Sequence, residues 1–190
     1  MDKPNTRDIL LGAMAACLQE HGYRSTSTTQ ILAETGVSRG SLYFHFPDGK
    51  QALAAAAVQL AGKHVSSWIN TEFAAAPNAA TAAGRLIESF AKTLCDSQFT
   101  KGCPVALCAL EAGEQEPDLQ SAVRSAYADW QDSIRAGLMS HGIGPRAALQ
   151  FAQLALLQIA GALLMARATR SLAPLKLAKS SIVELVGGYS

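Results

Sequence analysis

Apolar side chains recur every three or four positions along most of the chain, and short breaks rich in glycine and proline separate these periodic segments. Ala, Leu, Gln and Glu dominate the segments, whereas runs of β-branched residues are scarce. Both features favour helices over strands. The sequence therefore predicts an all-α fold.

The breaks and capping residues predict where the helices begin and end. A first apolar stripe should end at Gly22, a second helix should run from Ser27 to Gly36, and a short third should follow Ser38 and reach Phe44. Six further helices are expected at about 50–73, 82–95, from Pro104, 118–141, 145–170 and 175–186. The stripe of the first helix consists of Leu10, Leu11, Met14, Cys17 and Leu18.

Composition indicates a globular chain, because 49% of the residues are hydrophobic and only 16% are charged. The low charge suggests that much of the surface is apolar or covered by a partner. The apolar run 151–166 is interrupted by Gln153 and Gln158 and is shorter than the roughly 20 residues that span a bilayer. Residues 1–7 are polar and lack the apolar core of a signal peptide. We therefore expect a cytoplasmic protein with no membrane partner, whose four cysteines are thiols.

The most informative stretch runs from Thr26 to Phe46, where two short helices meet at residues 35–38. Gly36 tolerates the positive φ of a tight turn, and Val37 should be buried between the helices. Ile31, Leu42 and Phe46 can share one small core. The other face of the third helix then presents groups suited to bases and phosphates: Arg39, Gly40, Ser41, Tyr43 and His45. Residues 1–50 carry five basic and five acidic side chains, so binding must rest on placement and not on bulk charge.

The run GYRSTSTTQILAETGVSRGSLYFHF, residues 22–46, resembles the DNA-binding signature of the TetR family of regulators, and the likeness extends over roughly residues 9–60. It implies a helix-turn-helix DNA-binding domain over 1–48 and a helical ligand-binding and dimerisation domain over 49–190. The connection Phe46-Pro47-Asp48-Gly49-Lys50 has one glycine more than is usual, as in a branch that includes multidrug-resistance repressors. The DNA-binding residues that we expect are Ser27, Thr29, Ser38, Arg39, Gly40, Ser41, Tyr43, His45 and Lys50.

The C-terminal half carries scattered aromatic and polar residues that could line a ligand cavity, since such cavities are mainly apolar with a few polar groups. For any single one of these residues, plain core packing is the favoured explanation. Gln158 and Glu111 lie on otherwise apolar helices and are candidate polar contacts, although solvent could equally cover them. The candidate ligand-binding residues are Trp68, Phe90, Leu94, Cys103, Leu107, Glu111, Trp130 and Gln158.

The last two predicted helices are candidates for a dimer surface. Residues 151–165 are apolar on nearly every side, more than a helix with one solvent-facing side needs, and Gly161 allows close backbone approach. A fully buried central helix is the alternative. The family resemblance implies a four-helix bundle between subunits, and a two-fold dimer matches a palindromic operator.

Cys103 is a further candidate site, because it precedes Pro104 at a helix start, where the helix dipole favours a thiolate. Apolar neighbours would oppose this. The cysteine and histidine spacings fit no zinc pattern, and no catalytic constellation or phosphate-binding glycine loop is present. We therefore expect no enzyme activity, metal or cofactor.

The leading hypothesis is a repressor that binds palindromic operator DNA as a homodimer and is released by a small apolar or aromatic ligand. Regulation by thiol modification at Cys103 is the first alternative, and a helical thiol enzyme is a weaker one. The sequence leaves open activation in place of repression.

Overall fold

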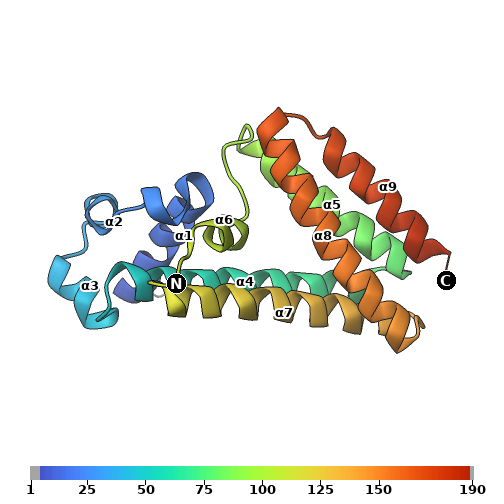
Figure 1. Cartoon of the computed structure of the whole chain (residues 1–190), viewed down its shortest axis with the longest axis horizontal. Helices are drawn as coiled ribbons and strands as arrows, with labels where there is room; N and C mark the ends of the chain where they lie inside the picture. The colour runs from blue at the N-terminus through green and yellow to red at the C-terminus, as the bar shows by residue number, and fades with distance from the viewer. Residues whose placement is uncertain (1–4, 189–190) are drawn as a thin grey trace. The chain divides into compact units, whose positions relative to one another are not determined.

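The computed structural model describes residues 5–188, and within that range it consists of helices and turns without a strand (Figure 1). The predicted all-α fold is confirmed. The helices are α1 (Thr6–Ser25), α2 (Thr28–Thr35), α3 (Arg39–His45), α4 (Lys50–Ala75), α5 (Ala79–Asp96), α6 (Pro104–Glu111), α7 (Pro117–Ser140), α8 (Pro145–Thr169) and α9 (Ala173–Gly187).

Local side-chain chemistry explains where several helices begin and end. Oγ of Ser27 accepts the backbone N–H of Gln30 at 3.1 Å, and Oγ of Ser38 accepts that of Ser41 at 3.1 Å, so both serines cap helix N-termini. Gly36 ends α2 with φ of 68°, a left-handed conformation that favours glycine. The α1 helix differs from the expectation, since it bends at Gly22 and continues to Ser25.

The chain divides into two compact units. Unit 1 comprises Met1–Gly62 and Cys103–Ala126, and unit 2 comprises Lys63–Gly102 and Tyr127–Ser190. The single boundary expected near residue 48 does not coincide with this division, because α6 packs against α1 and so belongs with the N-terminal helices. Packing that brings distant segments together cannot be read from helical periodicity alone.

Unit 1 has a core built from one side of each N-terminal helix. Its members are large side chains with no exposed surface, and they fix the spacing of α1, α2, α3 and the start of α4: Leu10, Met14, Leu18, Ile31, Leu42 and Leu53. The close approach of α4 and α7 within this unit depends on Gly62, because a Cβ there would lie 2.9 Å from Cβ of Ala126. The N-terminal core thus forms a rigid support for α3.

Unit 2 is built on α5, α8 and α9, which pack side by side (Figure 1). One side of α8 is buried through small residues, which allow close packing: Ala148, Ala152, Ala155, Ala162 and Ala166. The other side carries exposed Leu154, Leu157, Leu164 and Met165. The alternative of a fully buried α8 therefore does not apply to this chain on its own.

The α8 helix has nearly the bounds that the sequence predicted, but its apolar character extends beyond the run 151–166. It spans 25 residues and is, by length and composition alone, apolar enough to cross a membrane, so the expectation that no segment reaches this length is wrong. The error arose because the apolar run was taken to start at residue 151, whereas helical alanines extend it back to Pro145. Only 22% of its most apolar window is buried, so most of this apolar stretch is exposed in the isolated chain.

Candidate nucleic-acid interface

The α3 helix divides into an inner and an outer face. Leu42 is fully buried and Phe46, at its C-cap, is nearly so, as the sequence predicted. Arg39, Gly40 and Tyr43 are exposed, and Ser41 and His45 are half-buried. The structure thus brings the five residues proposed for base and phosphate contacts together on one short helix.

Arg39 and Tyr43 form a pair on the exposed side of α3. Cζ of Arg39 lies 5.8 Å from the centroid of the Tyr43 ring, within the range of a cation–π contact. Such a contact restricts the long arginine side chain before any ligand binds. A restrained guanidinium with several N–H donors is suited to the O6 and N7 acceptors of guanine in the major groove.

The glycine that distinguishes the connection after α3 supports Tyr43. Gly49 has φ of 62°, and a Cβ on it would lie 3.2 Å from Cε1 and 3.7 Å from the hydroxyl oxygen of Tyr43. Its N–H donates to the carbonyl of Phe46 at 2.8 Å, closing the turn before α4. The departure from the usual connection therefore has a local reason: only glycine combines this backbone conformation with an adjacent tyrosine ring.

The hydroxyl residues lie at helix N-termini. Oγ of Ser38 lies 3.0 Å from Oγ of Ser41, and Ser27 and Thr29 are exposed at the start of α2. A helix N-terminus carries unpaired N–H groups and a partial positive charge, both of which favour phosphate oxygens. These positions suit contacts that position a protein on DNA without reading its sequence.

Phe44 was missed by the sequence analysis. Its side chain is 81% exposed on α3, and its ring meets that of His45 edge to face at 5.1 Å. The signal was available, since Leu42 and Phe46 both face the core and a residue midway between them must point away. An exposed aromatic ring on this helix is suited to apolar contact with a thymine methyl group.

Lys50, which the sequence analysis expected to bind DNA, contacts residues of its own unit. Its Nζ donates to the backbone carbonyl of Arg24 at 3.4 Å and lies 4.3 Å from the centroid of the Tyr23 ring. Burial lowers the pKa of the ammonium, and the charges of Glu111 and Glu116 oppose this. The side chain is therefore folded onto the end of α1.

The candidate ligand-binding residues fall into both units. Cys103, Leu107 and Glu111 belong to unit 1 with α6, and Glu111 uses its carboxylate to accept the N–H of Arg24. Trp68 meets Phe90 edge to face at 5.2 Å in unit 2. In the same unit, Trp130 and Leu94 are buried, and Gln158 donates to Oγ of Ser181 at 3.4 Å.

Unit 2 contains a small apolar cavity that none of these eight residues lines. Its volume is about 20 Å³, close to that of a single water-sized probe. A drug-sized ligand requires several hundred Å³, so the cavity is nearly closed in this conformation. Its lining consists of Phe73, Ala83, Leu86, Ile134, Leu138, Phe151, Ala155, Ile159, Ile182 and Val186.

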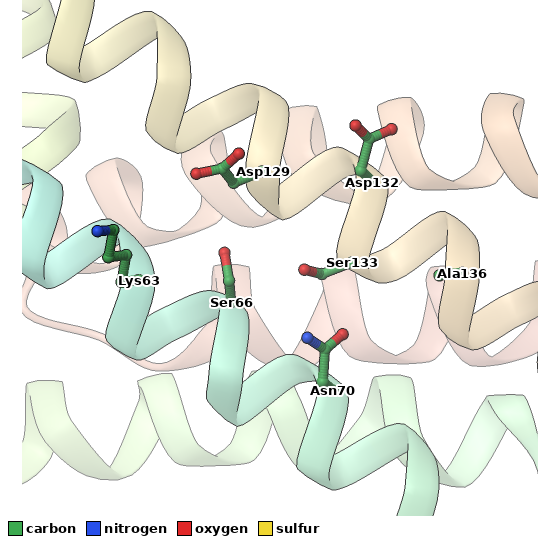
Figure 2. A pocket seen from close by; sticks show the side chains of 7 residues that line it. All are labelled: Lys63, Ser66, Asn70, Asp129, Asp132, Ser133 and Ala136. Carbon is green, nitrogen blue, oxygen red and sulfur yellow. The ribbon is translucent and has the colours of Figure 1, made fainter.

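A second hollow in unit 2 is a polar groove between α4 and α7. Figure 2 shows Lys63, Ser66 and Asn70 on α4 facing Asp129 and Ser133 on α7. The space that these residues line has a volume of about 400 Å³. Lys63, Asn70 and Asp129 are exposed, so the groove is open along its length. Ligand sites bury most of the ligand against apolar side chains, which makes this groove a poor match for an apolar effector.

The cysteines do not support the thiol hypothesis. Burial raises the pKa of the Cys103 thiol, although hydrogen bonds from the backbone of Ala106 and Val105 oppose this. Burial also raises the pKa of Cys108 to about 12, and the charge of Glu111 adds to the effect. The expected thiolate at the start of α6 is thus disfavoured, because desolvation outweighs the helix terminus. Among residues 5–188, no group of three or more metal-ligating side chains comes together.

Comparisons with known proteins identify the class to which this surface belongs. Residues 10–57 match the model of the bacterial regulatory proteins of the tetR family, and residues 79–181 match the C-terminal domain of LmrA/YxaF-like transcriptional regulators. The chain belongs to the TetR family of transcriptional regulators. Its helix-turn-helix consists of α2, the turn at Gly36 and the exposed helix α3. The protein is therefore a regulator of transcription and not an enzyme.

Individual relatives extend the likeness over nearly the whole chain. An uncharacterised HTH-type transcriptional regulator of Mycobacterium tuberculosis is 30% identical over 95% of this chain and 93% of its own length. The HTH-type transcriptional regulator LmrA of Bacillus subtilis is 30% identical over 98% of this chain and 99% of its own. A TetR transcriptional regulator from Legionella pneumophila, 18% identical, shares the fold with a TM-score of 0.85 over 97% of this chain and 98% of its own.

Proposed function

We propose that this protein is a repressor that binds a palindromic operator as a homodimer and dissociates when a small apolar or aromatic molecule occupies unit 2. The observation that carries the proposal is the exposed face of α3, where Arg39, Tyr43 and Phe44 stand outside a fully packed core. In helix-turn-helix proteins the second helix enters the major groove, and α3 holds that position here.

Phosphate contacts would come from the flanking elements. Six candidate phosphate ligands lie on the proposed reading helix and next to it in the chain: Ser27 and Thr29 at the start of α2, Ser38 in the turn, Ser41 and His45 on α3, and Lys50 at the start of α4. Gly40 would let the α3 backbone approach the groove wall closely, since nothing but Oγ of Ser38 at 3.9 Å lies near a Cβ placed there. These contacts would orient α3, and Arg39 would supply sequence preference.

The dimer is assigned to α8 and α9. Six large apolar side chains are exposed on these two helices, and exposed apolar side chains gathered in this way mark interaction sites: Leu154, Leu157, Leu164 and Met165 on α8, and Leu177 and Leu185 on α9. We assign the occupant as a second copy and not lipid, because exposed Gln153 and Gly161 interrupt the same side of α8. TetR-family regulators typically act as dimers, and a two-fold pair would match the symmetry of a palindrome. A protein that acts on the chromosome in this way would work in the cytoplasm.

The effector is assigned to the apolar interior of unit 2. The cavity there is almost closed, so a ligand would bind a conformation in which it has opened, and it would shift the population toward that conformation. A ligand that prefers the open conformation would weaken DNA binding only if that conformation positions α3 less favourably for contact with the operator.

The test is selection of bound duplexes from a random-sequence pool, followed by affinity measurement on the recovered sequence. We expect an inverted repeat whose half-sites are separated by about one helical turn, roughly 34–36 Å. Recovery of sequences without symmetry, or no enrichment over the starting pool, would contradict the proposal.

A further inference from the structure

Glu111 ends α6 with its carboxylate against the last turn of α1, inside unit 1. Its Oε2 accepts the backbone N–H of Arg24 at 2.8 Å. Its own backbone carbonyl accepts the Nε–H of the same arginine at 3.4 Å. Two hydrogen bonds therefore join the end of α6 to the end of α1.

The backbone of α1 admits this carboxylate only because residue 22 is glycine. Gly22 has φ of 77° and ψ of −177°, which breaks the helical geometry of α1. A Cβ at Gly22 would lie 2.6 Å and 2.8 Å from the two carboxylate oxygens of Glu111. The bend in α1 and the carboxylate of α6 thus fit each other as one built contact.

Lys50 binds the other side of the same peptide segment. Glu111 accepts the N–H of Arg24, and Nζ of Lys50 donates to the carbonyl of Arg24 while lying over the ring of Tyr23. Burial opposes the charged ammonium, and the carboxylates of Glu111 and Glu116 favour it. The lysine nearest the proposed phosphate path is therefore engaged by its own protein.

We propose that Glu111 is a positioning residue that retains Lys50 against the end of α1 and so makes its contact with a DNA phosphate conditional on the state of α6. The inference rests on the proposed DNA binding. A phosphate must compete with the Arg24 carbonyl, the Tyr23 ring and the negative charge of Glu111. The first segment of unit 2 ends at Gly102 and α6 begins at Pro104, so a rearrangement in unit 2 that pulls on this connection would move Glu111.

The first experiment measures Lys50 without DNA. Acetic anhydride labelling of the free protein, read by mass spectrometry, reports the accessibility of each lysine, with exposed Lys63 as internal reference. Glu111→Gln keeps an oxygen that can accept the Arg24 N–H but removes the charge. We expect Lys50 to react at least about threefold faster in Glu111→Gln, because the charge that retains it is gone.

Two variants control this labelling. Glu114→Gln removes an exposed carboxylate from the next loop and should leave Lys50 unchanged. Glu111→Asp keeps the charge on a shorter side chain and should raise the labelling less than Glu111→Gln. Equal labelling of Lys50 in wild type and Glu111→Gln, with both folded by circular dichroism, would overturn the inference.

The second experiment is a double-mutant cycle on operator affinity, comparing wild type, Glu111→Gln, Lys50→Ala and the double variant. We expect Glu111→Gln to bind about three- to tenfold more tightly than wild type, which is the scale of one partly exposed charge interaction in each subunit. The gain should vanish in the Lys50→Ala background. A gain that persists without Lys50 would mean simple relief of repulsion between Glu111 and DNA, and would overturn the positioning role.

The two proposals fail in different ways. If the wild type enriches no DNA sequence, the proposed function fails whatever the labelling shows. If the wild type binds DNA but neither Lys50 labelling nor affinity responds to Glu111→Gln, the positioning role alone fails.

Discussion

Arg39 combines exposure with restraint, and this combination makes it the best candidate for base recognition. Its guanidinium lies over the Tyr43 ring, and the ring in turn lies against the turn at Gly49. Three residues from α3 and the following turn thus support one another outside the core. A side chain ordered before binding loses less entropy when it forms hydrogen bonds.

We expect Arg39→Ala to weaken specific operator binding by about 1–3 kcal/mol, the cost of losing a bidentate contact with guanine. Arg39→Lys should recover little of this, because an ammonium cannot form the paired hydrogen bonds. Fluorescence anisotropy with the selected operator and with a scrambled duplex separates specific from general binding. Equal operator affinity for wild type and Arg39→Ala would show that α3 is not the reading helix.

The cysteines give a pH-dependent prediction. Burial raises the pKa of Cys103 above the ordinary 9.0, so its reactive thiolate should form only as the pH rises beyond that value. Exposed Cys95 should therefore be alkylated by iodoacetamide first, and DNA binding at neutral pH should survive the treatment equally in wild type and Cys103→Ser. Rapid modification of Cys103 at neutral pH, with loss of binding in the wild type alone, would restore the thiol-sensing alternative.

Residue placement on α3 could be predicted, whereas the contacts of Lys50 and Glu111 could not. The faces of a helix follow from its periodicity, so burial of Ile31, Leu42 and Phe46 follows from their spacing. Arg24 and Glu111 are 87 residues apart, and periodicity contains no information about such a pair. The same limit explains why Glu111 was considered for a ligand cavity.

At the scale of helices, α8 carries two different surfaces. Its alanine side packs within unit 2, and its leucine side is exposed. Leu156 and Leu163 are only half-exposed, whereas Leu157 and Leu164, one residue further along, lie on the exposed side. When a helix is apolar on nearly every side, the sequence does not show which side faces the core, because no polar face marks the solvent side.

We expect Leu157→Glu, at a side chain 71% exposed in the isolated chain, to convert the proposed dimer to monomers without unfolding unit 2. The physical reason is the cost of burying an unpaired carboxylate in an apolar interface. Sedimentation equilibrium at micromolar concentration measures the change, and Leu110→Glu on α6, 75% exposed in the other unit, is a matched control. A dimeric Leu157→Glu, or a monomeric wild type, would contradict the assignment to α8 and α9.

At the scale of the whole chain, the proposed release from DNA requires that a change in unit 2 alters DNA binding by unit 1. Helices α4 and α7 each contain residues of both units, and α6 of unit 1 follows the first segment of unit 2 in the chain. Gly137 brings α7 so close to α4 in unit 2 that a Cβ there would lie within 2.7 Å of three Phe73 ring atoms. Phe73 also lines the small cavity, so an occupant that enlarges the cavity would press on this contact.

Leu138→Ala tests whether the cavity is linked to DNA release. Leu138 is 1% exposed and lines the cavity, so truncation should lower the free energy of unfolding by about 2–5 kcal/mol and leave room for a small apolar molecule. Benzene should then raise the melting temperature of Leu138→Ala but not that of the wild type, because it binds the folded state alone.

If the cavity is the effector site, saturating benzene should also weaken operator binding by Leu138→Ala. Leu53→Ala removes an equally buried side chain from unit 1 and controls for lost stability. Benzene should not weaken its operator binding through unit 2. A benzene-stabilised Leu138→Ala whose operator affinity does not change would place the effector site elsewhere in the chain.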